Sequence, residues 1–134
     1  MPRQPQEGPE TDALTLSVPV LAPSLNTLLR THYRDRGRDR DKWTALLRHV
    51  AGRRRSAPPC AVAIVRRYAS RPLDLDNLYA AAKVPLDALV RAGILPDDDP
   101  TCVASLTCTQ EKVPTRLEQG TTITLRPITA ETDA

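Results

Sequence analysis

Residues 71–100 read RPLDLDNLYAAAKVPLDALVRAGILPDDDP, and this stretch decides both the expected fold and the expected chemistry. Asp74 and Asp76 stand two positions apart, and a run of three aspartates, Asp97 to Asp99, closes the stretch. Carboxylates at i and i+2 of an extended backbone point to the same side, where they repel each other unless a proton or a cation lies between them. Such oxygen ligands bind hard divalent cations, so the stretch predicts a magnesium site.

The segment upstream of this stretch is strongly basic. Between Arg30 and Arg55, ten arginines and lysines oppose three aspartates, a net charge of +7, although the whole chain carries only +3. A basic field beside a metal site suits an enzyme that holds a polyanion such as DNA. One Trp, three Tyr and no Phe argue against a protein that stacks single-stranded bases on aromatic side chains. The residues expected to contact DNA phosphates are Arg30, Arg34, Arg36, Arg38, Arg40 and Lys42.

The length of 134 residues predicts one domain, expected to span residues 13–129. Residues 1–12 are rich in Pro, Gln and Glu and are expected to form a disordered tail, with a flexible C-terminus at residues 130–134. The N-terminal residues lack the apolar core of a signal peptide, and no apolar run approaches a membrane span. We therefore expect a cytoplasmic, nucleoid-associated protein without a membrane partner.

The three cysteines, Cys60, Cys102 and Cys108, show no C-x-x-C pair. The two histidines lie far from them and lack ligand spacing, which argues against a zinc site. We expect reduced, buried thiols, as in a cytosolic protein.

The apolar pattern predicts the element order β-α-β-α-β-β. Strands are expected at residues 13–20, 60–68, 102–108 and 121–126, with the last two paired as a hairpin across a loop that contains Gly120. An apolar stripe predicts a helix from about Arg40, whereas Gly37 and alternating charge signs predict only weak helix before it. Residues 77–92 are expected to form a second helix that has a kink or a restarted turn at Pro85 and ends at Gly93. This order indicates an α/β (mixed α+β) domain with one mixed sheet and helices packed on it.

Each motif also has a plainer interpretation. Asp74 and Asn77 suit a helix N-cap, and the acidic residues 97–100 suit a polar turn. Lys83 forms either a weak i,i+4 ion pair with Asp87 or a phosphate contact beside the metal. The metal site requires that the chain returns one of the late aspartates to the D-x-D pair.

Together these residues resemble the RusA family of Holliday junction resolvases, small endodeoxyribonucleases of phage descent. The family's D-x-D-N-L signature matches Asp74, Asp76, Asn77 and Leu78; K-x-x-x-D-A-L matches Lys83, Asp87, Ala88 and Leu89; A-G matches Ala92 and Gly93; and D-D matches Asp97 and Asp98. P-S-L-N at residues 23–26 and R-x-H-Y-R at residues 30–34 also look like the family's N-terminal pattern. The resemblance covers about residues 14–127.

The resemblance implies a RusA-like fold and a Mg²⁺-dependent homodimer that resolves four-way DNA junctions by paired nicks, in recombination and repair, with Mn²⁺ as a substitute metal. Asp74, Asp76 and Asp98 are then the metal-associated acids, and Lys83 is the cation needed for cleavage. Asp97 is a further metal ligand, although the acidic run leaves open which of its members binds. In the family pattern the lysine stands about one helical turn sooner, at the position that Ala80 occupies here.

Two other functions fit the same residues. One is a catalytically degenerate relative that binds branched DNA and recruits other proteins, and the displaced lysine leaves room for it. The other is a less selective metal-dependent nuclease. No small-molecule cofactor is expected for any of the three, and a phage or prophage origin suits all of them.

Overall fold

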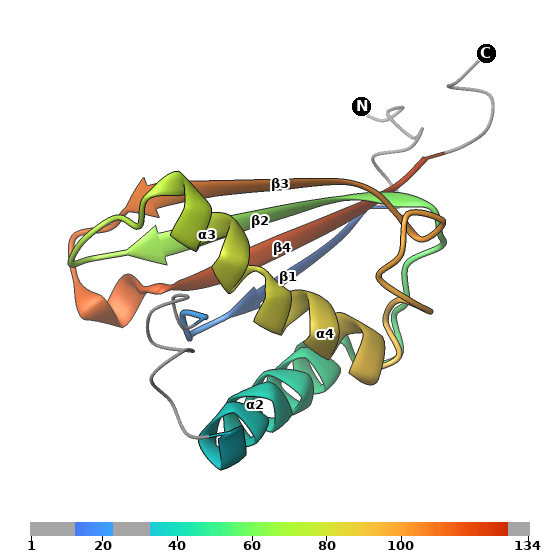
Figure 1. The fold of residues 1–134 in the computed structure, drawn as a ribbon, viewed down its shortest axis with the longest axis horizontal. Coiled ribbons are helices and arrows are strands. Elements are labelled where there is room, and N and C mark those ends of the chain that lie inside the picture. The colour runs from blue at the N-terminus through green and yellow to red at the C-terminus, as the bar shows by residue number, and fades with distance from the viewer. Residues whose placement is uncertain (1–12, 23–32, 129–134) are drawn as a thin grey trace, which may run out of the picture.

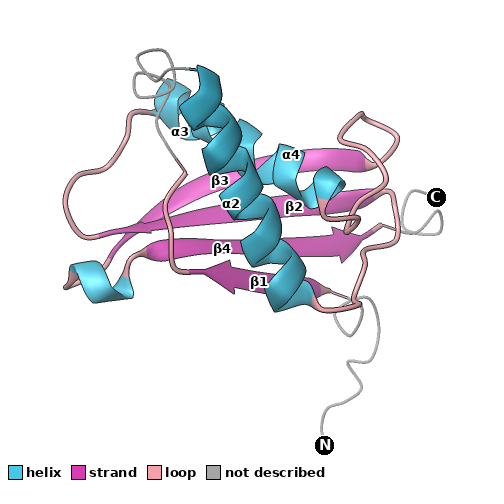
Figure 2. Cartoon of the chain, turned by 90° about the horizontal axis from the view of Figure 1, so that it is seen from below, coloured by secondary structure: helices cyan, strands magenta, loops and turns pink. Residues whose placement is uncertain are grey.

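The computed structural model describes residues 13–22 and 33–128 of the chain. The predicted tail, the predicted flexible C-terminus and Arg30 lie outside the described residues. A mixed four-stranded sheet forms the centre of the protein, and the helices lie on one of its faces (Figures 1 and 2). This arrangement confirms the predicted α/β class with a single mixed sheet.

The strands of the sheet follow the order β1-β4-β2-β3. β4 is antiparallel to both of its neighbours, whereas β2 and β3 are parallel. Parallel strands need a long crossover, and the residues between β2 and β3 supply it as helices. The strands are β1 (Leu14–Val18), β2 (Cys60–Tyr68), β3 (Val103–Lys112) and β4 (Gly120–Pro127).

The predicted hairpin between the last two strands is wrong. β4 pairs with β1 and β2, and a loop with a short 3-10 helix, η3 (Arg116–Glu118), carries the chain past β2 to reach that place. Ile123 and Leu125 of β4 are completely buried (0 % exposed). A central position between β1 and β2 buries these side chains better than the sheet edge would, which explains why long-range pairing replaces the local hairpin.

Helix α2 spans Tyr33–Ala51, so the expectation of only weak helix before Arg40 is wrong. Trp43, Leu47 and Ala51 are buried against the sheet and fix the second half of the helix. Once these turns exist, adding residues at the N-terminus needs no new nucleus, and one glycine costs only about 1 kcal/mol. No helix within the described ranges is long and apolar enough to cross a membrane.

The second predicted helix is two helices, α3 (Leu75–Ala81) and α4 (Lys83–Arg91), separated at Ala82. Pro85 is the third residue of α4, where its missing N–H is not needed for an intrahelical bond. Gly93 follows α4 with φ = +80°, a conformation that glycine adopts without strain. The predicted restart of the helix around Pro85 and its end at Gly93 are therefore confirmed.

All three thiols are free and buried, as predicted. Burial raises the pKa of Cys60 and raises the pKa of Cys108 to about 11, because a buried thiolate loses its hydration. At pH 8 these thiols therefore stay protonated in the folded protein and ionise more readily once the chain unfolds. We expect Ellman's reagent to label Cys60 and Cys108 slowly in the native protein and rapidly in guanidinium chloride. Fast native labelling of both at pH 8 would contradict this burial.

Candidate metal and DNA site

The D-x-D pair lies at the N-terminus of α3. Asp74 has an extended backbone (φ −69°, ψ 168°), and its Oδ1 accepts hydrogen bonds from the backbone N of Asn77 (2.9 Å) and from Nδ2 of Asn77 (3.0 Å). Asp74 is thus an N-cap, the plainer interpretation of the motif. Because the helix begins at Leu75, Asp76 already lies in its first turn, so the expectation of an extended backbone through both aspartates is wrong.

This pair has no basic side chain as an ion-pair partner in the described part of the chain. Asp74 and Asp76 are exposed, and neither forms an ion pair with a described residue. Leu75 between them is 67 % exposed, so no packed side chain screens the two carboxylates from solvent. Two such carboxylates are a hard oxygen donor set that remains available for a cation.

The late aspartates form a turn after α4. Asp97 Oδ1 accepts a hydrogen bond from the backbone N of Asp98 (2.7 Å), and Asp99 Oδ1 accepts one from the backbone N of Thr101 (3.0 Å). The hydroxyl of Thr101 also donates to Asp99, and these bonds lower the pKa of the Asp99 carboxyl. The Asp98 carboxylate makes no hydrogen bond within the described ranges, so of the three it is the one left for another ligand.

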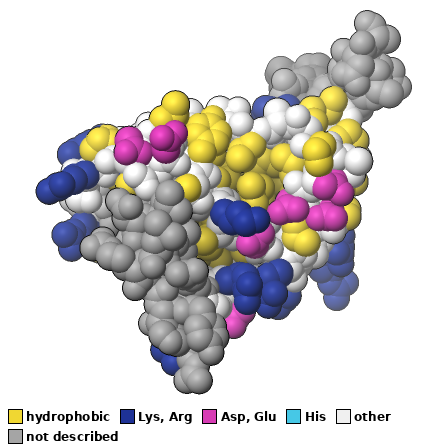
Figure 3. Space-filling model, viewed as in Figure 1, with side chains coloured by type: hydrophobic (Ala, Val, Ile, Leu, Met, Phe, Trp, Pro, Cys, Tyr) yellow, Lys and Arg dark blue, Asp and Glu magenta, His cyan; other side chains and the backbone are white. Residues whose placement is uncertain are grey.

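The structure does not bring the early and late aspartates together within one chain. Helices α3 and α4, of seven and nine residues, run end to end between the two groups (Figure 1). At about 1.5 Å per residue the two helices together are roughly 25 Å long, so the D-x-D pair and the late aspartates lie at different places along this face. The acidic side chains on this face accordingly gather in separate places, near the start of α3 and past the end of α4 (Figure 3).

The predicted convergence of Asp74, Asp76 and Asp98 is not found among the described residues, and their assignment as metal ligands stays a prediction. Residues 13–22 and 33–128 contain no group of three or more Asp, Glu, His or Cys side chains placed to hold a metal ion. The physical reason is the direction of α3 and α4, which carry the chain away from the D-x-D pair. Asp74 and Asp76 alone fit a Mg²⁺ ion that takes its remaining ligands from water and substrate phosphate, but they do not form a complete protein cage.

Asp98 lies instead beside the C-terminal half of α4. It lines an open depression together with Arg40, Asp87, Val90 and Arg91. Arg40 and Arg91 are the positive charges of this depression, and Asp87 and Asp98 are its negative ones. The balance of charge means that Asp98 does not need a metal ion to be stable where it lies.

Lys83 is the first residue of α4. Its Nζ lies 3.7 Å from Oδ1 of Asp87, with 70 % of the lysine side chain exposed. This is the i,i+4 ion pair of the plainer interpretation, and exposed pairs of this kind contribute only a few tenths of a kcal/mol. The ammonium group can therefore exchange Asp87 for a phosphate at little cost.

Five of the six predicted DNA-binding residues are part of α2, and the sixth, Arg30, lies outside the described residues. Arg34 and Arg36 lie in its first turn, and their side chains are outside the described ones. Arg38, Arg40 and Lys42 are exposed. Arg38 and Lys42 are one turn apart, whereas Arg40 lies toward α4 in the depression beside Asp98, so the basic residues occupy two sides of the helix.

Further basic residues at the α2–α4 contact were not predicted. Arg48 donates from NH2 to the backbone O of Arg91 (3.0 Å), and NH2 of Arg91 lies 3.5 Å from Oδ1 of Asp41. A second open depression next to the first is lined by Asp41, Thr44, Ala45, Arg48 and Arg91. No signal in the sequence pairs Arg48 with Arg91, because the contact depends on how the two helices pack.

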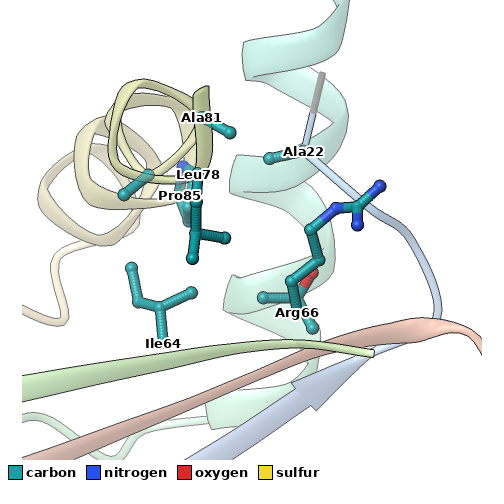
Figure 4. A pocket seen from close by; sticks show the side chains of 8 residues that line it. Ala22, Ile64, Arg66, Leu78, Ala81 and Pro85 are labelled. Atoms are coloured by element: carbon teal, nitrogen blue, oxygen red, sulfur yellow. The ribbon is translucent and has the colours of Figure 1, made fainter. Parts of the chain in front are cut away.

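Arg66, near the end of β2, is another basic residue that the predicted site did not include. Its side chain is half-buried on the helix-covered face of β2 and lines a small apolar cavity of about 20 Å³ beneath α3 and α4 (Figure 4). The signal was present in the alternation, because Cys60, Val62 and Ile64 point to the same face as Arg66.

A scan against protein-family models finds none that matches the chain, and a search of curated proteins finds no match.

Proposed function

We propose that the protein is a Mg²⁺-dependent endodeoxyribonuclease that resolves four-way DNA junctions as a homodimer. The observation that carries the proposal is the pair of exposed carboxylates, Asp74 and Asp76, without an ion-pair partner among the described residues of a chain with 19 lysines and arginines. Two uncompensated carboxylates at the start of a helix, on a basic protein, suit a metal that bridges protein and phosphate. The resemblance of the 71–100 stretch to RusA resolvases supports the same conclusion.

The roles of the side chains follow from their surroundings. The N-cap bonds hold Asp74 in one rotamer, and Asp76 offers both of its carboxylate oxygens because it makes no hydrogen bond to a described residue. When bound, Mg²⁺ supplies an activated water and offsets charge on the leaving oxygen. Lys83 stabilises negative charge on the scissile phosphate after giving up its weak pair with Asp87.

A homodimer explains both the substrate and the position of Asp98. A four-way junction is close to two-fold symmetric and needs two matched nicks, so two equivalent sites related by a two-fold axis suit it. Because Asp98 lies beside Asp87 of α4 and forms no group with the D-x-D pair of its own chain, we propose that Asp98 completes the site of the partner subunit. Arg38, Arg40 and Lys42 then contact the phosphates of the arms.

One observation favours a second function. The acids do not converge within one chain and Lys83 already has a partner, as in a protein that binds branched DNA without cutting it. In that case the arginines of α2 and the α2–α4 depressions bind phosphate, and the aspartates serve only as helix cap and turn.

The test compares a synthetic four-way junction with a flap and a linear duplex of the same sequence. We expect symmetric nicks in the junction with Mg²⁺ or Mn²⁺, none with EDTA, and junction affinity that falls steeply with salt. Tight junction binding without nicking in either metal would establish the binding protein. Equal nicking of all three substrates would establish an unselective nuclease.

A further inference from the structure

The segment that leads into the D-x-D pair is held by one side chain from β3. Gln110 accepts a hydrogen bond at Oε1 from the backbone N of Leu73 (2.7 Å) and donates from Nε2 to the backbone O of Leu73 (2.8 Å). The amide thus pairs with both backbone groups of Leu73, as a neighbouring strand would. Leu73 directly precedes Asp74, so this pair of bonds fixes the chain immediately before the N-cap.

Arg66 fixes the orientation of the Gln110 amide. Its NH1 donates to Oε1 of Gln110 (3.2 Å) and to the backbone O of Arg71 (3.2 Å). Since Oε1 accepts from both Arg66 and Leu73, the Nε2 of Gln110 must face the Leu73 carbonyl. The guanidinium also lies over the ring of Tyr68, 5.5 Å from its centroid, which restricts its movement.

The half-buried position of Arg66 costs free energy of folding, because the guanidinium loses hydration there. Its Nε is buried without a hydrogen-bond partner, it forms no ion pair among the described residues, and burial lowers its pKa. A half-buried cation without a carboxylate destabilises a fold unless its hydrogen bonds offset the loss of hydration. In Figure 4 the guanidinium lies at the edge of the cavity beneath α3 and points toward Ala22.

We infer that Gln110 is a positioning residue for the metal site, and that Arg66 supports it. The inference rests on the proposed function, because it assigns Gln110 to Asp74 as a metal ligand. The cap to Asn77 fixes the Asp74 carboxylate relative to α3, while Gln110 fixes the backbone of the preceding residue relative to the sheet. Residues that orient metal ligands in this way typically change metal affinity or activity by about 10–100-fold when they are replaced.

The test compares Gln110→Leu with the matched variant Gln119→Leu. Gln119 holds the same loop at its other end, where its Oε1 accepts a hydrogen bond from the backbone N of Ala69 (2.8 Å). We expect Gln110→Leu to raise the Mn²⁺ concentration for half-maximal nicking and for half-maximal thermal stabilisation by about 10–100-fold. Gln119→Leu should stay within about 3-fold of the wild type, since it contacts no metal-site residue. Junction affinity in EDTA should be the same for all three proteins.

A second readout separates this inference from the proposed function. Absence of nicking and of Mn²⁺ stabilisation in the wild type would sink the proposed function. In that case, amide hydrogen exchange at Asn77 still tests whether Gln110 holds the start of α3 in place. The inference requires faster exchange at Asn77 in Gln110→Leu than in Gln119→Leu. Equal metal requirement and equal Asn77 exchange in the two variants would overturn it. If Gln110→Leu does not fold, Gln110→Glu keeps the acceptor for the Leu73 N–H but places a carboxylate oxygen against the Leu73 carbonyl, and it should shift both readouts in the same direction.

Discussion

Replacing Asp76 with Asn is expected to lower the rate of junction nicking on the order of 100-fold or more, while junction binding stays equal or becomes tighter. The substitution keeps the shape of the side chain and removes one charged oxygen ligand. Asp76 makes no hydrogen bond to a described residue, so the fold should not change. Binding should not weaken, because the variant carries less negative charge next to the DNA. Single-turnover nicking with excess protein and a mobility-shift assay in EDTA measure the two effects separately.

Asp41→Asn is the matched control for this substitution. Asp41 is also exposed, but it lies on α2 and pairs with Arg91. The control removes the same charge and should affect binding alone. Nicking at the wild-type rate by Asp76→Asn would remove Asp76 from the metal site, and loss of junction binding would show that the aspartate has a structural role.

A mixture of Asp76→Asn and Asp98→Asn chains is expected to regain nicking that neither variant shows alone. If Asp98 acts in the partner's site, a mixed dimer contains one site with both substitutions and one site with none. The intact site should nick one strand of the junction, and nicks on both strands should remain rare. The measurement is the fraction of singly nicked junction after the two proteins are unfolded together and refolded at equal concentration.

The other outcomes of this mixing experiment are equally informative. If Asp98→Asn alone nicks at the wild-type rate, Asp98 belongs only to the depression that it shares with Asp87, and Asp74 and Asp76 hold the metal with water and phosphate. If both variants and their mixture are inactive, Asp98 acts within its own chain, which would require α4 to move relative to α3.

The parts of the fold that depend only on residues close together in the sequence could be predicted. The apolar stripe of Trp43 and Leu47, the proline in the first turn of α4 and the glycine after it each act within a few residues. The place of β4 could not be predicted in this way. The last two strands, β3 and β4, are close in sequence, but the side chains of β4 are buried more completely between β1 and β2. The residues of β4 alone do not specify which strands it pairs with.

The candidate site shows the same division. The residue types predict a hard-metal donor set and a helix cap, and of these the cap is confirmed, since Asp74 caps α3. Distances between distant segments depend on the direction of α3 and α4, which no spacing of aspartates encodes. The role of Gln110 could not be predicted for a related reason. Its partner Leu73 lies on a different segment, and Gln110 binds the backbone N and O of Leu73, which do not depend on the type of side chain.

The order of the strands also determines when the protein can fold. β1 precedes the other three strands in the chain, yet it pairs only with β4, the last of the four. Until residue 127 is available, β1 has no hydrogen-bonding neighbour in the sheet and one edge of β2 is bare. A nascent chain that lacks β4 therefore exposes strand edges that attract other chains, and the sheet can close only once β4 has left the ribosome.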